Sequence, residues 1–189
     1  MSTDLNALAR DVAFLRDAVD RTGGTPAGIY FLWAGIVGAG AVVMGRAEWA
    51  DRVGWYWSVA SVLGVIGSAV VGWRHGARTG AASARRGIRT FLHWCGVTAA
   101  VFAAMVLVAR GMLPVQAVSA VALLLVSLGY YLMGVHVDRW SYLPAVLALG
   151  AAATLVVFPG SWVLTGVACA TGLTAMGVLE LVRPRRMHV

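Results

Sequence analysis

The stretch that decides the fold is residues 113–135, LPVQAVSAVALLLVSLGYYLMGV, which contains no charged residue. A helix needs about 20 consecutive apolar residues to cross the hydrocarbon of a bilayer, so this stretch is long enough to span a membrane. Similar stretches recur along the chain, and the full set covers residues 26–45, 53–73, 91–109, 113–135, 142–158 and 161–182. The sequence therefore predicts about six membrane-spanning segments.

The composition of the whole chain favours lipid as its solvent. Of its 189 residues, 60% are hydrophobic and 12% are charged, which excludes an ordinary soluble domain. Inside a bilayer the backbone must satisfy its own hydrogen bonds, so a spanning segment is either a helix or a strand of a closed barrel. Barrel strands alternate apolar and polar residues, and residues 117–125 and 145–158 show no such alternation. We expect an all-α, polytopic integral membrane protein, with residues 26–182 forming a six-helix bundle.

The basic residues are distributed unevenly between the two sides of the predicted membrane domain. The chain has no lysine, and its formal net charge of +7 comes from arginine. With six spans, one side holds both termini and twelve arginines, namely Arg10, Arg16, Arg21, Arg74, Arg78, Arg85, Arg86, Arg89, Arg139, Arg183, Arg185 and Arg186. The other side holds Arg46, Arg52 and Arg110. Because arginine is enriched in cytoplasmic connectors, both termini, including the basic tail 183–189, are predicted to be cytoplasmic.

This pattern also bears on localisation and on partners. The charge follows membrane topology, so we expect the lipid bilayer and no nucleic acid as a partner. Residues Arg74, Arg78, Arg85, Arg86 and Arg89 form a cluster that we expect to contact anionic lipid. Exclusive use of arginine together with abundant alanine, glycine and valine is typical of a GC-rich genome. We therefore expect a multi-pass protein of a bacterial inner (plasma) membrane.

Residues 1–25 are predicted to form a cytoplasmic amphipathic helix followed by a glycine-rich linker. Apolar residues recur at alternating three- and four-residue intervals, a spacing typical of a coiled-coil seam, at Leu5, Leu8, Val12, Leu15 and Val19. The opposite face mixes aspartate with arginine, so it presents no excess positive charge to anionic lipid. We expect the apolar face to bind a protein partner or a second copy of the chain. The alternative is that the helix folds back across its own bundle.

Small residues and aromatic residues mark the predicted packing faces and membrane interfaces. Small residues at four-residue spacing, Gly64-Ser68-Gly72 and Gly166-Ala170-Thr174, allow close approach of helices, within one chain or between chains. Aromatic residues gather at the ends of the spans, including Tyr30, Trp33 and Trp94, and we interpret most of them as interfacial belts. Residues 48–57, EWADRVGWYW, belong to such a belt, with an external aromatic binding site as the alternative.

The residues that could carry chemistry lie near the predicted cytoplasmic ends of the spans. His93 and Cys95 begin the third span, His136 ends the fourth, and Glu180 ends the sixth. Imidazole, thiolate and carboxylate groups suit a transition metal, and two histidines on facing helices could hold haem iron. The spacing within each helix does not by itself form a chelate, so a metal or haem site is a hypothesis beside a purely interfacial role for these histidines.

Three classes of function remain open from these residues. The leading hypothesis is a non-enzymatic protein that works through association, as a regulatory, sensory or accessory subunit. The second is an oligomeric channel or facilitator for a small solute, lined by hydroxyl groups such as those of Ser68, Ser127, Thr154, Thr171 and Thr174. The third is a metal- or haem-binding membrane protein, which an absorption spectrum and metal analysis would distinguish from the others. No catalytic motif is present to predict an enzyme.

Overall fold

The fold is described from a computed structural model, in which residues 7–8, 10–12, 25–79, 81–114, 117–137 and 139–182 are described. These residues contain helices and no strands. Six helices are long and apolar enough to cross a membrane: α2 (Ala27–Met44), α3 (Val53–Thr79), α4 (Ala81–Ala109), α5 (Ala117–His136), α6 (Tyr142–Val157) and α7 (Trp162–Val182). Short 3-10 helices, η1 (Ala47–Arg52) and η2 (Arg139–Ser141), lie in two connectors. The expected all-α bundle of membrane-spanning helices is confirmed.

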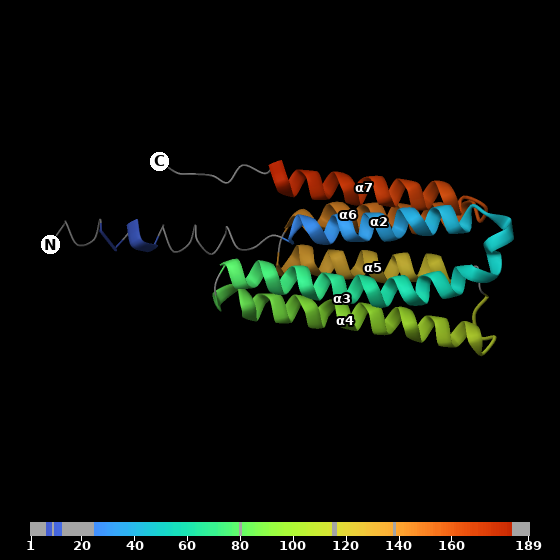
Figure 1. The fold of residues 1–189 in the computed structure, drawn as a ribbon, viewed down its shortest axis with the longest axis horizontal. Helices are drawn as coiled ribbons and strands as arrows, with labels where there is room; N and C mark the ends of the chain where they lie inside the picture. The colour runs from blue at the N-terminus through green and yellow to red at the C-terminus, as the bar shows by residue number, and fades with distance from the viewer. Residues whose placement is uncertain are drawn as a thin grey trace.

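Helices α3 and α4 differ from the sequence expectation. Residues 74–90 were expected to form a connector, but α3 continues to Thr79 and α4 begins at Ala81. Alanine and arginine dominate the first turns of α4, and both residue types favour helix. Figure 1 shows these two helices extending past the others at the end of the bundle where α2 begins and α7 ends, which we call the terminal end. The opposite end, which contains η1, is the η1 end.

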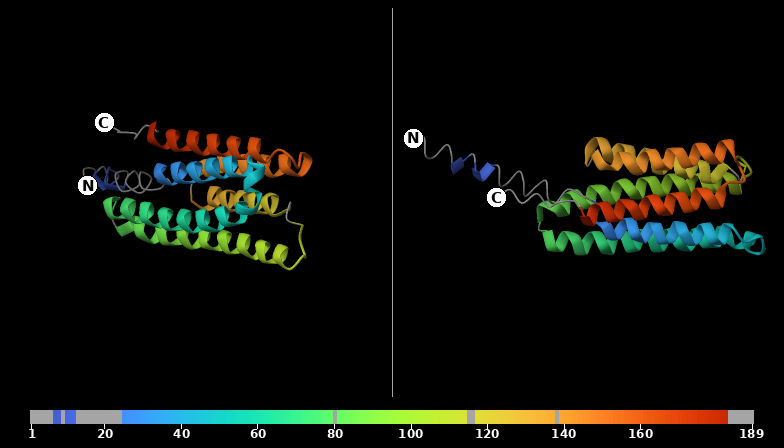
Figure 2. Two further views of the ribbon diagram at one scale, coloured as in Figure 1. Left: turned by 45° about the vertical axis from the view of Figure 1, so that its right-hand side comes forward. Right: turned by 90° about the horizontal axis from the view of Figure 1, so that it is seen from above.

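The helices pack in chain order, and the last one returns to the first. Each helix lies against its neighbour in the sequence, and α7 packs extensively against α2 (Figures 1 and 2). Successive helices run in opposite directions because short connectors join them. The bundle is therefore a closed ring of six antiparallel neighbours, and the contact between α2 and α7 completes it.

Small residues allow α2 and α7 to approach closely. Gly166 lies so near α2 that a Cβ atom added to it would be 2.8 Å from the Cβ and 3.4 Å from the Cα of Ala41. Ala41 is completely buried. The small residues of α3 serve the same purpose, since an added Cβ on Gly64 would meet the ring of Trp33 at 2.7 Å. The predicted small-residue faces thus pack within the chain at these positions.

Aromatic side chains fill the interior toward the terminal end. Tyr30 is only 3% exposed and packs with Leu173 and Met176 of α7, while Tyr130 of α5 lies against the same cluster. The ring of Trp94 stands edge-on to Tyr130, with centroids 4.7 Å apart. The interpretation of Tyr30 as part of an interfacial belt is wrong, because its side chain points into the bundle rather than toward lipid headgroups.

Side chains form hydrogen bonds between the helices. The Trp33 indole donates to Ser68 Oγ at 3.1 Å, and the Ser127 hydroxyl donates to the carbonyl oxygen of Ala145 at 2.8 Å. The Tyr56 hydroxyl donates to the carbonyl oxygen of Ile36. In the hydrocarbon of a bilayer such bonds replace water, so they hold α3 on α2 and α6 on α5 in a fixed rotation.

Candidate functional site

The predicted metal or haem ligand His93 is used to join two helices. Its Nε2 atom lies 3.0 Å from the carbonyl oxygen of Gly129, so the ring nitrogen donates a hydrogen bond from α4 to α5. Its ring also stands edge-on to that of Trp94, with centroids 5.7 Å apart. Gly129 is buried, and a Cβ atom added to it would lie only 2.9 Å from the side chain of Val97. This close packing of α5 against α4 brings the carbonyl oxygen of Gly129 near His93. His93 therefore has a clear structural role in this bundle.

The other three candidate ligands are not gathered around His93. His136 is exposed at the end of α5, and Cys95 is a half-buried free thiol one helical position beyond Trp94. Glu180 is half-buried on α7 and already interacts with another group of the chain. Within the described residues, no three side chains of histidine, cysteine, aspartate or glutamate lie close enough together to hold one metal ion. The metal or haem site stays a prediction.

The arginine cluster lies where α3 and α4 extend beyond the other helices. Arg74, Arg78 and Arg89 are exposed, and the side chains of Arg85 and Arg86 lie outside the described part. Because α3 ends at Thr79 and α4 begins at Ala81, the cluster sits on two adjacent helix ends rather than on a long loop. Contact with anionic lipid stays a prediction for these residues.

The predicted partner-binding face of the N-terminal helix is described at two positions. Leu8 and Val12 are helical, and their side chains are 62% and 57% exposed. In Figure 1 the short blue helical segment near the N-terminus lies apart from the six long helices. Leu5, Leu15 and Val19 lie outside the described residues. Residues four apart share one face of a helix, so Leu8 and Val12 form an exposed apolar patch.

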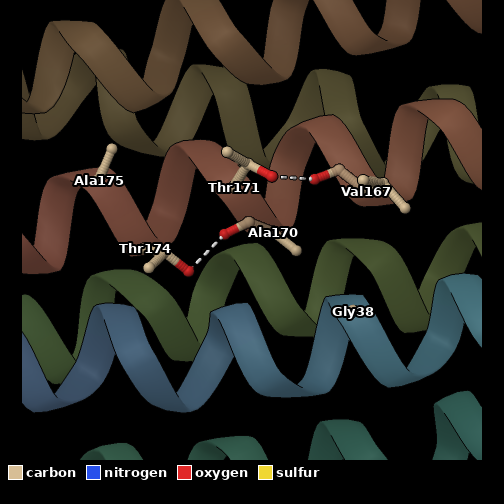
Figure 3. A pocket seen from close by; sticks show the side chains of 6 residues that line it. All are labelled: Gly38, Val167, Ala170, Thr171, Thr174 and Ala175. Atoms are coloured by element: carbon tan, nitrogen blue, oxygen red, sulfur yellow. Dashed lines mark hydrogen bonds between the residues drawn. The ribbon is translucent and has the colours of Figure 1, made fainter.

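The hydroxyl groups considered for a solute path bond mostly to their own helices. Thr171 donates to the carbonyl oxygen of Val167 and Thr174 to that of Ala170, each at 2.9 Å. Thr154 bonds in the same way to Gly150 at 2.8 Å. Thr171 and Thr174 line a shallow hollow of about 470 Å³ on α7 and α2, together with Gly38. Figure 3 shows how these residues lie on the two helices. With their hydroxyls already bonded, these threonines add little polarity to the hollow.

A larger open groove lies between α2, η1 and α3, with a volume of about 940 Å³. Its apolar part includes Gly35 and Ala39 of α2 and Leu63 of α3. Trp49 and Arg52 of η1 line one end. The aromatic stretch 48–57 indicated this end of the groove in the sequence. The apolar part is formed only by the packing of α2 against α3, so no pattern in the sequence indicated it.

Comparison with known proteins adds no relative on which an assignment could rest. No protein-family model, no curated protein and no solved structure matches this chain.

Proposed function

We propose that this protein is a non-enzymatic subunit of a bacterial inner membrane that works through association. It presents its N-terminal helix in the cytoplasm to a helix of a protein partner, in a regulatory, sensory or accessory role. The six-helix bundle anchors that helix to the membrane.

The exposure of Leu8 and Val12 carries this proposal. Large apolar side chains outside the membrane-spanning helices would be in contact with water, and such exposure is unfavourable by about 25 cal/mol for each Å² of apolar surface. Contiguous exposed apolar surface on a soluble segment is typical of a protein contact. The exposure also disfavours the alternative in which this face folds back onto the bundle. Arg10 lies two residues from both Leu8 and Val12, so it is on the opposite, charged face of the helix.

The orientation of the bundle supports a cytoplasmic partner. Arg74, Arg78 and Arg89 are exposed at the terminal end, on the same side of the bundle as the start of α2. An excess of arginine marks the cytoplasmic side of a membrane protein. The N-terminal helix therefore faces the cytoplasm in this proposal.

Reporter fusions test this orientation. A fluorescent protein that matures only in the cytoplasm should be active when fused after Val189, and a phosphatase that folds only outside it should be inactive there. Insertions after Glu48 in η1 should give the reverse result. A phosphatase active at Val189 and inactive after Glu48 would contradict the cytoplasmic orientation of both termini.

Site-specific photo-crosslinking in native membranes tests the partner contact. A photoreactive residue at Leu8 should form an adduct with one defined partner protein, whereas the same residue at Arg10, on the opposite face of the helix, should not. Leu15→Asp should reduce the Leu8 adduct by about tenfold or more, because the seam would then desolvate an unpaired carboxylate. Arg16→Asp, on the charged face, should change it by less than about twofold.

Two results would contradict the proposal. Equal adducts from positions 8 and 10, or equal losses for Leu15→Asp and Arg16→Asp, would show that the apolar stripe makes no specific contact. An adduct with twice the mass of this chain would replace the partner with a second copy.

A further inference from the structure

From the groove between α2, η1 and α3, we infer that the protein binds one phospholipid, with its phosphate against Arg52 and an acyl chain along α2. This site is independent of the N-terminal helix, so its test and that of the proposed function have separate outcomes. It lies at the η1 end, opposite the arginine cluster of α3 and α4.

The length of the groove matches one leaflet of a bilayer. On α2 it runs from Phe31 to Val43, a separation of twelve residues that corresponds to a rise of about 18 Å at 1.5 Å per residue. One leaflet of a hydrocarbon core is roughly 15 Å deep. Because Val43 is near the η1 end of α2 and Phe31 is in the second turn from its other end, the groove extends from the η1-end interface past the middle of the membrane.

The chemistry of the groove changes along this length in the way a phospholipid does. Arg52 and Trp49 line the η1 end, and the remainder is lined by apolar or small side chains such as Gly35, Ala39 and Leu63. An arginine guanidinium forms strong hydrogen bonds with phosphate, and tryptophan favours the headgroup level of a membrane. A lipid chain fills the apolar part without leaving a polar group unsatisfied.

The guanidinium of Arg52 is available for such a phosphate. The neighbouring cation Arg46 is already engaged, since its Nη1 lies 3.7 Å from Glu48 Oε1 and its guanidinium carbon lies 5.0 Å from the centre of the Trp49 ring. Arg52 is exposed, and the structure shows no ion pair for it among the described side chains. A bound phosphate would supply a negative charge to this guanidinium.

The same charge disfavours a second copy of the chain in the groove. Two copies with the same orientation in a membrane would be related by an axis along the membrane normal, so each Arg52 would lie at the same depth as the other. None of the described groove-lining side chains is acidic. Closing the groove between two copies would bring like charges together, whereas a phospholipid neutralises them.

Glycine offers a direct way to fill the groove without disturbing the bundle. A Cβ atom added to Gly35 meets nothing within 4 Å, so a large side chain there would extend into the groove. Gly150 of α6 is a matched control, because it is also exposed, helical and open at its Cβ position, and it lies outside the groove. For the charge, Arg110 is the control, since it is an exposed arginine beyond the end of α4.

Native mass spectrometry of the delipidated full chain, titrated with phosphatidylglycerol and with a diacylglycerol of the same acyl chains, tests the site. Arg52→Gln should weaken phosphatidylglycerol binding about tenfold and leave diacylglycerol binding unchanged, because only the phosphate contact is lost. Arg110→Gln should change neither. Gly35→Phe should weaken both lipids by about tenfold, and Gly150→Phe neither.

Each contrary result overturns the inference. If Arg52→Gln and Arg110→Gln bind phosphatidylglycerol equally well, Arg52 does not hold a phosphate. If Gly35→Phe retains lipid as well as Gly150→Phe does, the groove is not the binding site. A dimer that Gly35→Phe dissociates without any change in lipid binding would identify a second copy as the occupant. Circular dichroism of all four variants verifies that they are folded.

Discussion

Gly166→Val is expected to lower the free energy of unfolding of the bundle by about 3 kcal/mol. The first atom of any side chain at this position would lie 2.8 Å from the Cβ and 3.4 Å from the Cα of Ala41. The Cα of Ala41 is a backbone atom, so it cannot move aside by a change of rotamer as a long side chain can. Helices α2 and α7 would have to separate, and their contact closes the ring. Reversible unfolding in mixed micelles, followed by circular dichroism, measures the loss.

Two glycines on neighbouring helix surfaces provide controls for Gly166. Gly150→Val adds the same side chain where nothing lies within 4 Å, so it should change stability by less than about 0.5 kcal/mol. Gly172→Val meets the flexible end of Leu147 and should give an intermediate loss, because that side chain can change rotamer. Equal stability of the Gly166 and Gly150 variants would show that α2 and α7 are not in close contact.

Tyr30→Ala is expected to cost about 3–5 kcal/mol of stability, measured by the same unfolding experiment. Tyr30 is 3% exposed, and its ring packs with Ala34, Leu173 and Met176. Removing the ring leaves a cavity between α2 and α7 that neighbouring side chains fill only in part. Tyr30→Phe keeps most of the packing and should cost less than half as much.

Tyr131 is the matched control for Tyr30. It belongs to the same residue type, lies on a membrane-spanning helix and is 52% exposed, with its ring 5.7 Å from that of Tyr142. Tyr131→Ala leaves no enclosed cavity and should cost less than about 1 kcal/mol. Similar losses for the alanine variants of Tyr30 and Tyr131 would rule out the buried position of Tyr30.

The membrane-spanning character of the chain could be predicted because it depends on local composition. The free energy of transferring a span from water to lipid depends on the residues of that span. A stretch such as 113–135 is therefore recognised as a span without knowing which helices pack against it. The ends of α2, α6 and α7 agree with the predicted spans within one or two residues. The end of α3 and the start of α4 did not follow from hydropathy, because alanine and arginine form helix in water as readily as apolar residues do in lipid.

The candidate sites depended on contacts that composition does not encode. His93 was identified as a possible ligand, but its bond to the carbonyl oxygen of Gly129 depends on α4 lying against α5 at one particular rotation. The groove at Arg52 likewise needed the packing of α2 against α3. His93 and Gly129 are 36 residues apart, and the two sides of the groove come from different helices. A pattern within one segment therefore reveals neither contact.

The number of spans and their helical nature follow from the residues of each segment, because the hydrophobic effect and backbone hydrogen bonding act locally in a bilayer. Which faces meet follows from the tertiary structure alone. Lipid is as apolar as leucine, so hydrophobicity does not choose one helix face over another, and shape does. Gly166 against Ala41, Tyr30 in the interior and the open groove beside Gly35 are all results of that fit.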